Sequence, residues 1–192
     1  MKWNGTYLDW VGIEAPIGAP VGASSATSGS LTAAAKYWVY VTYRNMETGV
    51  ESNPSFGVEI TIAGGQSSIG TLQIPVSPDP QVNQRRIWIS GANAAENAGP
   101  IYLAENAAEE TTVDDNSAIT YTGGITRVDT TNATITDFDE NSPPPSGSLV
   151  RSFKDRLWVS GNPLAPTRIH YSGVLTPDTY DGTAYLELDQ DT

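Results

Sequence analysis

The side chains best suited to chemistry in this chain are carboxylates that stand close together in the sequence. They form four groups: Glu109 with Glu110, Asp114 with Asp115, Asp137 with Asp139 and Glu140, and Asp189 with Asp191. A glycoside hydrolase needs two carboxylates held roughly 5–10 Å apart across a cleft. Acidic turns bring carboxylates together without forming a cleft, so these groups alone do not indicate an enzyme.

Calcium is a more natural partner for such loops, because its usual ligands are the oxygens of Asp, Glu and Asn. Residues 114–116 and 137–141 supply side chains of this kind. Neither segment has the Asp-x-Asp-x-Asp-Gly spacing of an EF-hand loop. We predict that the protein has no metal site and no cofactor, and calcium in these loops is the alternative left open.

Nucleophilic and transition-metal chemistry depend on histidine and cysteine, and the chain has one His and no Cys. His170 lies between Ile169 and Tyr171 in a predicted strand, without a nucleophile-elbow motif, which favours a structural role. A site with several imidazole or thiolate ligands is excluded by count. The common glycine-rich nucleotide motifs are also missing. We therefore predict a protein that is not an enzyme.

The five Trp and nine Tyr are the other chemically distinctive residues. Aromatic rings can stack on the apolar faces of sugars, and they are also enriched where proteins contact one another. Their scattered positions favour protein contacts over a single sugar-binding face. The predicted interface residues are Trp3, Trp10, Trp38, Tyr40, Trp158 and Tyr171.

Composition indicates an all-β protein of one or two domains. The 192 residues include 18 Gly and 13 Pro, and Ser, Thr and Asn fall in short clusters. The formal charge of −12, from 22 acidic and 10 basic residues, repels phosphate backbones and argues against nucleic-acid binding. The first residues lack an apolar signal region, and no run is long enough to span a bilayer, so we expect no membrane partner.

Residues 37–55 hold the strongest structural signal and position two of the candidate rings. Residues 37–43 are all aromatic or β-branched, which is typical of a strand, and the turn-like stretch 45–49 ends in Gly. Alternation places Tyr37, Val39, Val41 and Tyr43 on one face and Trp38, Tyr40, Thr42 and Arg44 on the other. Large rings on both faces predict a strand covered twice, by its own core and by another domain or subunit. The alternative is that Trp38 and Tyr40 are half-buried surface aromatics.

The rest of the chain divides into four predicted parts. Residues 1–30 form an extended N-terminal arm, 31–141 a β-sandwich, 142–148 a Pro-rich linker, and 149–192 a small C-terminal β segment. Further sandwich strands are predicted at 57–62, 68–74, 86–90, 101–105, 111–113, 119–122 and 134–138. Gly123-Gly124 predicts a hairpin that joins 119–122 to 125–128.

The C-terminal segment is too small to bury both faces of its own sheet. Residues 153–160 and 167–172 predict two strands joined by 161–166. A blade of three or four strands needs cover on both sides. The segment must therefore pack on the sandwich, pair with another subunit, or begin a longer natural protein.

The order of three patterns resembles a known family. Tyr-x-Val-x-Val-x-Tyr-x-Asn at 37–45, followed by Thr-Gly-x-Glu-Ser-x-Pro-Ser at 48–55, resembles the last hairpin of a fibronectin type III-like sandwich. The version found in bacteriophage virion and tail proteins is the most similar. Residues 85–90 with 101–104 resemble a later hairpin of those modules, and 134–137 before the prolines 143–145 resembles their closing strand and exit linker.

The C-terminal segment has a resemblance of its own. Asp-Arg-Leu-Trp-Val-Ser at 155–160, Arg-Ile-His-Tyr-Ser at 168–172 and Thr-Pro-Asp-Thr-Tyr at 176–180 resemble the first blade of a β-propeller. That propeller follows the sandwich in certain phage tail proteins. The resemblance covers one blade only.

Together these resemblances imply an all-β protein with an Ig-like or fibronectin-III-like antiparallel sandwich. They imply a structural component of a phage tail or head–tail connector, made in the host cytoplasm and carried in the virion. Its partners would be further copies of itself, in a symmetric ring, and other virion proteins. The alternative is a carbohydrate-binding module of a receptor-binding or cell-surface protein.

Overall fold

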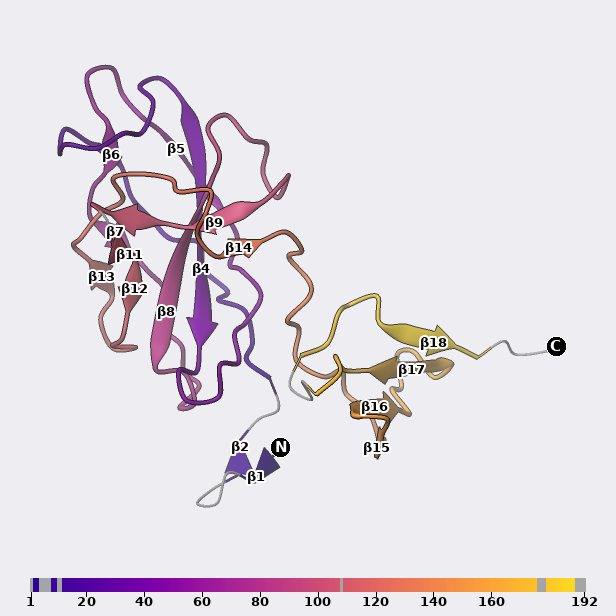
Figure 1. Ribbon diagram of the computed structural model, residues 1–192. Helices are drawn as coiled ribbons and strands as arrows, with labels where there is room; N and C mark the ends of the chain where they lie inside the picture. The colour runs from indigo at the N-terminus through magenta and orange to yellow at the C-terminus, as the bar shows by residue number, and fades with distance from the viewer. Residues whose placement is uncertain (1, 4–7, 10–11, 108, 176–178, 189–192) are drawn as a thin grey trace.

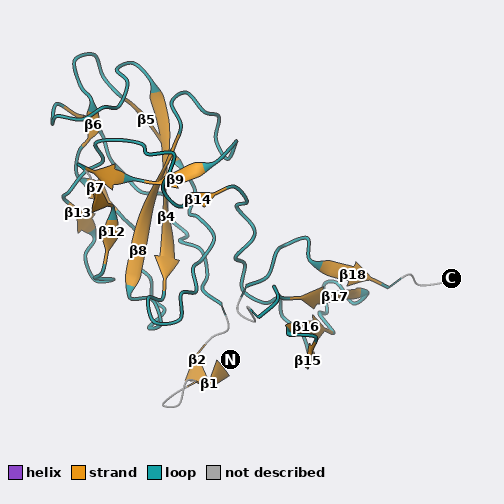
Figure 2. Ribbon diagram, in the orientation of Figure 1, coloured by secondary structure: helices purple, strands orange, loops and turns teal. Residues whose placement is uncertain are grey.

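The protein consists of a β-sandwich and a second, smaller lobe at the C-terminal end (Figure 1). The computed structural model describes residues 2–3, 8–9, 12–107, 109–175 and 179–188. All of these residues lie in strands, turns or loops, and no helix occurs among them (Figure 2). The predicted all-β sandwich class is confirmed.

The main sheet of the sandwich is built on two long central strands. Its order is β14-β9-β8-β4-β5, and β12 also pairs with β8. The strands are β4 (Lys36–Arg44), β5 (Val58–Thr61), β8 (Gln84–Ser90), β9 (Ile101–Leu103), β12 (Thr112–Val113) and β14 (Thr134–Ile135). The pairs are antiparallel, and the register of β4 with β8 sets Tyr40 opposite Trp88. Strand β4 matches the strand predicted from aromatic and β-branched residues.

The second layer is made of short strand pairs. β3 (Ser24–Ser25) pairs with β6 (Ser68–Ile69), and β7 (Leu72–Gln73) pairs with β13 (Thr120–Tyr121). Two further short pairs are β1 (Lys2–Trp3) with β2 (Leu8–Asp9), and β10 (Glu105–Asn106) with β11 (Glu109–Glu110).

The hydrophobic core lies between these two layers. Its buried members include Val39, Val41, Ile87 and Ile89 from the main sheet, and Ile69, Leu72 and Ile125 from the second layer. Each fully buried aliphatic side chain stabilises the fold by roughly 1.5–3 kcal/mol relative to exposure. The alternation predicted for residues 37–43 holds in part, because Tyr37, Val39 and Val41 belong to this core.

The predicted hairpin of 119–122 with 125–128 is wrong. β13 pairs with β7 instead, and Ile125 forms a backbone bridge with Ile69. Gly124 has a φ of 72°, and a Cβ built on it would meet the carbonyl oxygen of Ile69. The glycine therefore allows the chain to cross closely over β6, a role that the sequence pattern does not distinguish from a tight turn.

The predicted N-terminal arm joins the sandwich well before residue 31. Ile13 is fully buried and packs in a small cluster with Tyr43 and Val82. Val21 bridges to Gln73, and β3 forms part of the second layer. The sandwich therefore includes the chain from residue 12 on. Short edge strands are held mainly by backbone hydrogen bonds. This stretch therefore has no alternation of apolar and polar residues from which its strands could be predicted.

The C-terminal lobe is a four-stranded antiparallel sheet in the order β15-β16-β17-β18. Its strands are β15 (Leu149–Phe153), β16 (Arg156–Ser160), β17 (Arg168–Tyr171) and β18 (Tyr185–Glu187). Residues 153–160, predicted as one strand, instead contain the turn between β15 and β16. The proline-rich linker of residues 142–148 runs from the sandwich to this lobe (Figure 1).

Arg85 is a charged side chain placed inside the sandwich. It has 0% exposure, and burial lowers its pKa. Nη1 donates a hydrogen bond to the carbonyl oxygen of Pro75, and Nη2 donates to those of Asp115 and Ala118. The guanidinium therefore ties two loops to the end of strand β8.

Replacing Arg85 with Ala should lower the free energy of unfolding by about 3 kcal/mol, since it leaves three carbonyl oxygens without their donor and opens a cavity. Urea denaturation measures the change. Arg151→Ala, on exposed strand β15, is the control and should stay within about 0.5 kcal/mol of the native chain. Equal losses for both variants would contradict this role of Arg85.

Candidate interaction surface

The outward face of strands β4 and β8 is covered by the chain itself. Tyr40 has 0% exposure and forms a buried cluster with Trp88, Ile101 and Leu103. The ring of Phe138 packs edge-on against Tyr40, with centroids 5.3 Å apart. Burial is the main cause that raises the pKa of the Tyr40 hydroxyl. The double cover predicted for β4 is present, and its second part comes from residues of the same chain.

Tyr40 is accordingly reassigned from the predicted interface to the core, because a side chain buried in its own chain has no surface to offer a neighbour. Trp38 packs against the same cluster but is only partly buried, so part of its ring can still be contacted. Trp3 lies in β1, of which the backbone alone is described, and Trp10 lies outside the described residues.

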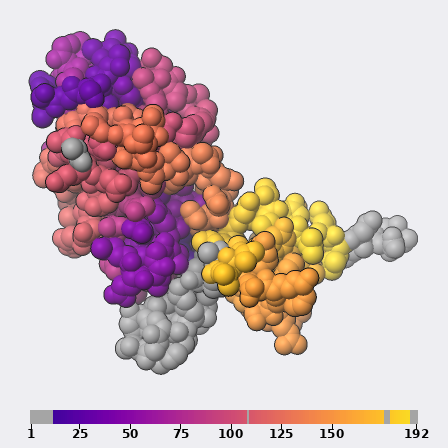
Figure 3. All heavy atoms as spheres, in the orientation of Figure 1, coloured from indigo at the N-terminus to yellow at the C-terminus, as the bar shows by residue number. Residues whose placement is uncertain are grey.

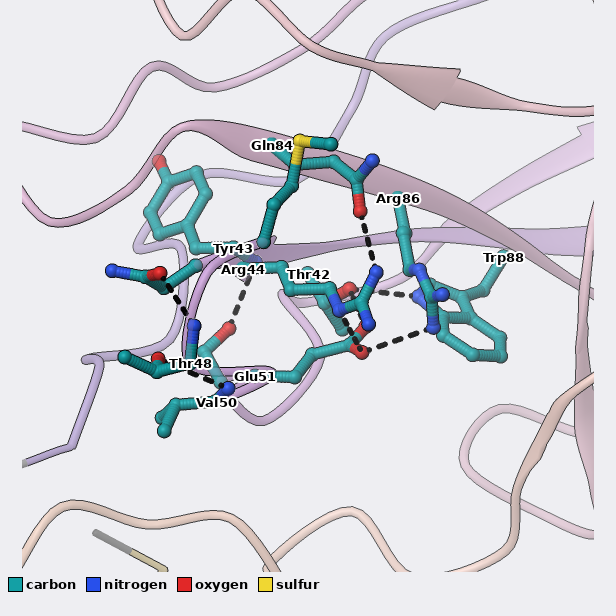
Figure 4. A network of polar contacts seen from close by, with 12 residues as sticks. Thr42, Tyr43, Arg44, Thr48, Val50, Glu51, Gln84, Arg86 and Trp88 are labelled. Atoms are coloured by element: carbon teal, nitrogen blue, oxygen red, sulfur yellow. Dashed lines mark hydrogen bonds and ion pairs between the residues drawn. The ribbon is translucent and has the colours of Figure 1, made fainter.

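A polar network closes the other half of this face (Figure 4). The Thr42 hydroxyl donates to Glu51 Oε1 at 2.5 Å and accepts from Trp88 Nε1 at 2.8 Å. Arg86 Nη1 lies 3.2 Å from Glu51 Oε2, and Arg44 Nε lies 3.9 Å from it. Because Glu51 comes from the loop after β4, this network fastens that loop to the sheet.

The C-terminal sheet presents the remaining predicted rings. Trp158 on β16 is directly opposite Tyr171 on β17, and their ring centroids lie 5.1 Å apart. The guanidinium of Arg156 lies over the Tyr171 ring at 5.1 Å from its centroid. Both rings are half-buried. The structure thus brings together a second pair of the six predicted interface residues, besides Trp38 and Tyr40.

Exposed apolar side chains surround this ring pair. Strand register places Leu149, Phe153, Trp158, Tyr171 and Leu186 on the same side of the sheet, which we call the aromatic face. Leu149, Phe153 and Leu186 are 66%, 61% and 50% exposed. The opposite side also has an exposed aliphatic residue, Val150. Figure 3 shows this lobe projecting from the sandwich.

Three of these surface residues, Leu149, Phe153 and Leu186, were not among the predicted interface residues. A signal was present, because β15 reads Leu-Val-Arg-Ser-Phe, which is too apolar for a strand that solvent surrounds. All five residues of β15 are exposed.

A small polar joint connects the lobe to the sandwich. Asn53 Oδ1 accepts from the backbone amide of Asn141 at 2.7 Å, and Nδ2 donates to the Ser142 hydroxyl at 2.8 Å. Ser142 in turn pairs with Tyr180 through two backbone hydrogen bonds of 2.9 Å. Beside this joint lies a pocket of about 470 Å³. Its lining includes Glu140, Arg156, Tyr171, Asp181 and neighbouring hydroxyl groups.

Two of the acidic residues singled out in the sequence, Asp115 and Asp137, cap turns. Asp137 Oδ1 accepts from the amide of Asp139 at 2.9 Å, and Asp115 Oδ1 accepts from the amide and hydroxyl of Ser117. Within the described ranges, no three His, Asp or Glu side chains gather as they would around a metal ion. Asp189 and Asp191 lie outside those ranges.

His170 lies on β17, where its ring contacts that of Tyr185 with centroids 5.5 Å apart. Its Nε2 is buried and has no hydrogen-bond partner among the described residues. A catalytic histidine would be held there by a hydroxyl or carboxylate. Burial first, and then the nearby Arg168, lower the pKa of the imidazole, so the folded lobe favours the neutral ring.

The C-terminal sheet should therefore loosen as the pH falls. In the unfolded chain the pKa of His170 is near 6.5, and in the folded chain it is lower. The stability that the neutral imidazole gives the folded lobe is therefore complete above about pH 6.5 and is lost as the pH falls below it. Amide hydrogen exchange of β17 peptides, corrected for intrinsic rates, should show weaker protection at about pH 5.5 than at about 7.5. His170→Gln should reduce that difference, and an unchanged difference would contradict the assignment.

Comparison with known proteins adds no relative from which a function could be carried over. No protein-family model, no curated protein and no solved structure matches the chain. The described part of the chain also contains no helix that is long and apolar enough to cross a membrane. Function must therefore be inferred from the exposed C-terminal sheet.

Proposed function

We propose that the protein is a non-enzymatic structural subunit of a bacteriophage particle, in the tail or the head–tail connector. The sandwich is a rigid packing module, and the C-terminal sheet contacts neighbouring subunits in a symmetric ring. Other virion proteins are further partners, and assembly begins in the host cytoplasm. The resemblance of residues 37–55, 85–104 and 134–145 to phage virion modules supports the phage assignment, and the state of the C-terminal sheet supports the assembly role.

The observation that carries the assembly role is a sheet without a core of its own. Among the described residues from 149 to 188, the buried apolar side chains are Val159 and Tyr180. Leu149, Phe153 and Leu186 are at least half exposed in the same lobe. Burying each against a neighbour would contribute roughly 1.5–3 kcal/mol. A neighbouring subunit would therefore stabilise the lobe and be bound by it.

The chemistry of the aromatic face also fits a protein contact. Trp, Tyr and Arg are the residues enriched among the strongest contributors to binding, and Trp158, Tyr171 and Arg156 are stacked there already. A preassembled cluster loses little side-chain freedom when a partner covers it. The half-buried rings of Trp158 and Tyr171 would thus form the centre of one protein contact, and the exposed Leu149 and Phe153 would form its edge.

Replacing both Leu149 and Phe153 with Ser should weaken self-association at least about tenfold, because two apolar anchors are lost. Sedimentation velocity over a range of concentrations measures the association. Phe56→Ser is the matched control, since Phe56 is 72% exposed on the sandwich and should leave association unchanged. A native chain that stays monomeric at every concentration, or a double variant that associates normally, would refute the proposal.

A carbohydrate-binding module is the second candidate, and the pocket beside the lobe joint favours it. Tyr171 supplies a ring, Arg156 and Asp181 supply charged groups, and Thr179 and Thr183 add hydroxyls to the lining. Sugar sites combine an aromatic surface with a few polar groups of this kind. Asp181 Oδ1 already accepts from the amide and hydroxyl of Thr183, which leaves its other oxygen for a ligand.

If this second candidate is right, the isolated chain should bind a glycan on an array, and Tyr171→Ala should abolish that binding by removing the stacking surface. Tyr185→Ala is the control, because Tyr185 lies on the other side of the same sheet. Glycan binding that survives Tyr171→Ala, or no binding at all, would argue against a sugar site in this pocket.

A further inference from the structure

The turn between β15 and β16 is held in an unusual backbone conformation. Lys154 and Asp155 have φ values of 49° and 58°, so two consecutive residues other than Gly are left-handed. A two-residue type I′ hairpin turn requires this, and Asn-Gly would adopt it with less strain. The turn is supported by the Leu175 amide, which donates to the Asp155 carbonyl oxygen at 2.7 Å, and by Trp158 Nε1, which donates to that of Phe153 at 3.0 Å.

The side chains around this turn form an exposed and largely apolar knob, at which Lys154 stands beside Asp155. We call Phe153, Lys154, Val174 and Leu175 the hairpin tip. Its three apolar members are 61%, 53% and 76% exposed, in that order. Lys154 Nζ lies 5.4 Å from the centre of the Phe153 ring. Exposed apolar groups gathered at one projecting turn are typical of a contact site.

The sandwich has a groove with the complementary character. Its volume is about 500 Å³, and it is lined by Val76, Pro80, Val82, Asn83 and residues 114–117. Val76 is 39% exposed, so its apolar atoms are available in the groove, whereas Val82 is 4% exposed and belongs to the core that supports it. Asp114 and Asp115 are both exposed and supply negative charge. We call this feature the acidic groove.

The acidic groove is held in shape before any partner arrives. Asn116 Nδ2 donates to the Ser77 carbonyl oxygen at 2.9 Å, and Asn116 Oδ1 accepts from the Ser77 amide at 3.0 Å. Arg85 holds the carbonyls of Pro75 and Asp115 from inside the sandwich. A groove whose two sides are fastened together costs little ordering energy on binding.

The two features carry opposite local charge. The β15–β16 hairpin, residues 149–160, contains Arg151, Lys154 and Arg156 against Asp155, a formal charge of +2, whereas Asp114 and Asp115 give the groove lining a formal charge of −2. Opposite surfaces of this kind attract each other and orient two copies on approach. The groove is lined by sandwich residues alone, so the tip of the same chain does not occupy it.

We propose that the hairpin tip of one copy inserts into the acidic groove of a second copy, with Phe153 against the apolar lining and Lys154 beside Asp114. This inference rests on the proposed function, because it names the partner of the C-terminal sheet. The tip and the groove are different surfaces, so after one contact the first copy keeps a free groove and the second copy keeps a free tip. A contact of this heterologous type produces a ring or an open chain of copies.

A charge exchange between two variants tests the contact. Lys154→Glu and Asp114→Lys should each weaken self-association at least about tenfold at low salt, because each places like charges together. Mixing the two variants should restore association. In the mixture the acidic tip of one variant meets the basic groove of the other, and the remaining tip and groove keep their native Lys and Asp. Glu110→Lys, an equal charge change outside the groove, is the control and should associate normally.

Disulfide trapping gives a second readout that does not depend on charge. The chain has no Cys, so any disulfide must come from introduced residues. Val76→Cys in the groove and Val174→Cys in the tip, on separate chains of different size, should form mixed dimers on mild oxidation. Leu164→Cys, at 95% exposure, replaces Val174→Cys in the control and should form few.

The outcomes separate this inference from the proposed function. If the native chain self-associates but Asp114→Lys has no effect and no mixed disulfide exceeds the control, the groove is not the partner, and assembly through the C-terminal sheet still stands. If the native chain does not self-associate at all, both the groove contact and the proposed ring are wrong. Restored association in the mixture, together with the trapped dimer, would establish the contact.

Discussion

Burial of both faces of the β4–β8 strand pair is the constraint on which the rest of the structure depends. One face carries Val39, Val41 and Ile87 into the core between the layers. The other carries Tyr40 and Trp88, which are too large and apolar to leave in water. Phe138 supplies part of the cover for these rings, so the chain after β14 must return across the sheet before it can leave for the linker.

The two lobes differ in how completely they satisfy their own surfaces. In the sandwich, the outward face is closed by an aromatic cluster at one end and by the Glu51 network at the other. In the C-terminal sheet, Leu149 and Phe153 have no such cover. The sandwich can therefore act as a rigid body, whereas the lobe gains stability from whatever covers it. This difference is a physical reason to regard the sandwich as the self-supporting part of the fold and the C-terminal sheet as the part suited to contact another protein.

The long strands could be predicted because their apolar residues alternate over many positions. Residues 37–43 are the clearest case, and β4 extends the predicted strand by one residue at each end. The short strands could not, because a pair such as β3 with β6 depends on backbone hydrogen bonds between segments more than forty residues apart. The turn at Lys154 and Asp155 was missed for a related reason. Asp155 is a common turn residue, but Lys154 is not and no Gly accompanies the pair, so their left-handed conformation is imposed by the pairing of β15 with β16.

The order of residues alone was enough to identify an all-β chain, the inward side of β4 and a C-terminal sheet too small to cover itself. Alternation and composition are local properties, so they can be read from one segment without knowing which other segments it packs against. Which rings are buried required the folded chain: Tyr40 is covered by Phe138, nearly a hundred residues later, while Phe153 is left bare. Burial is a property of contacts between distant segments. A pattern within one strand can state that a side chain needs cover but cannot say what supplies it.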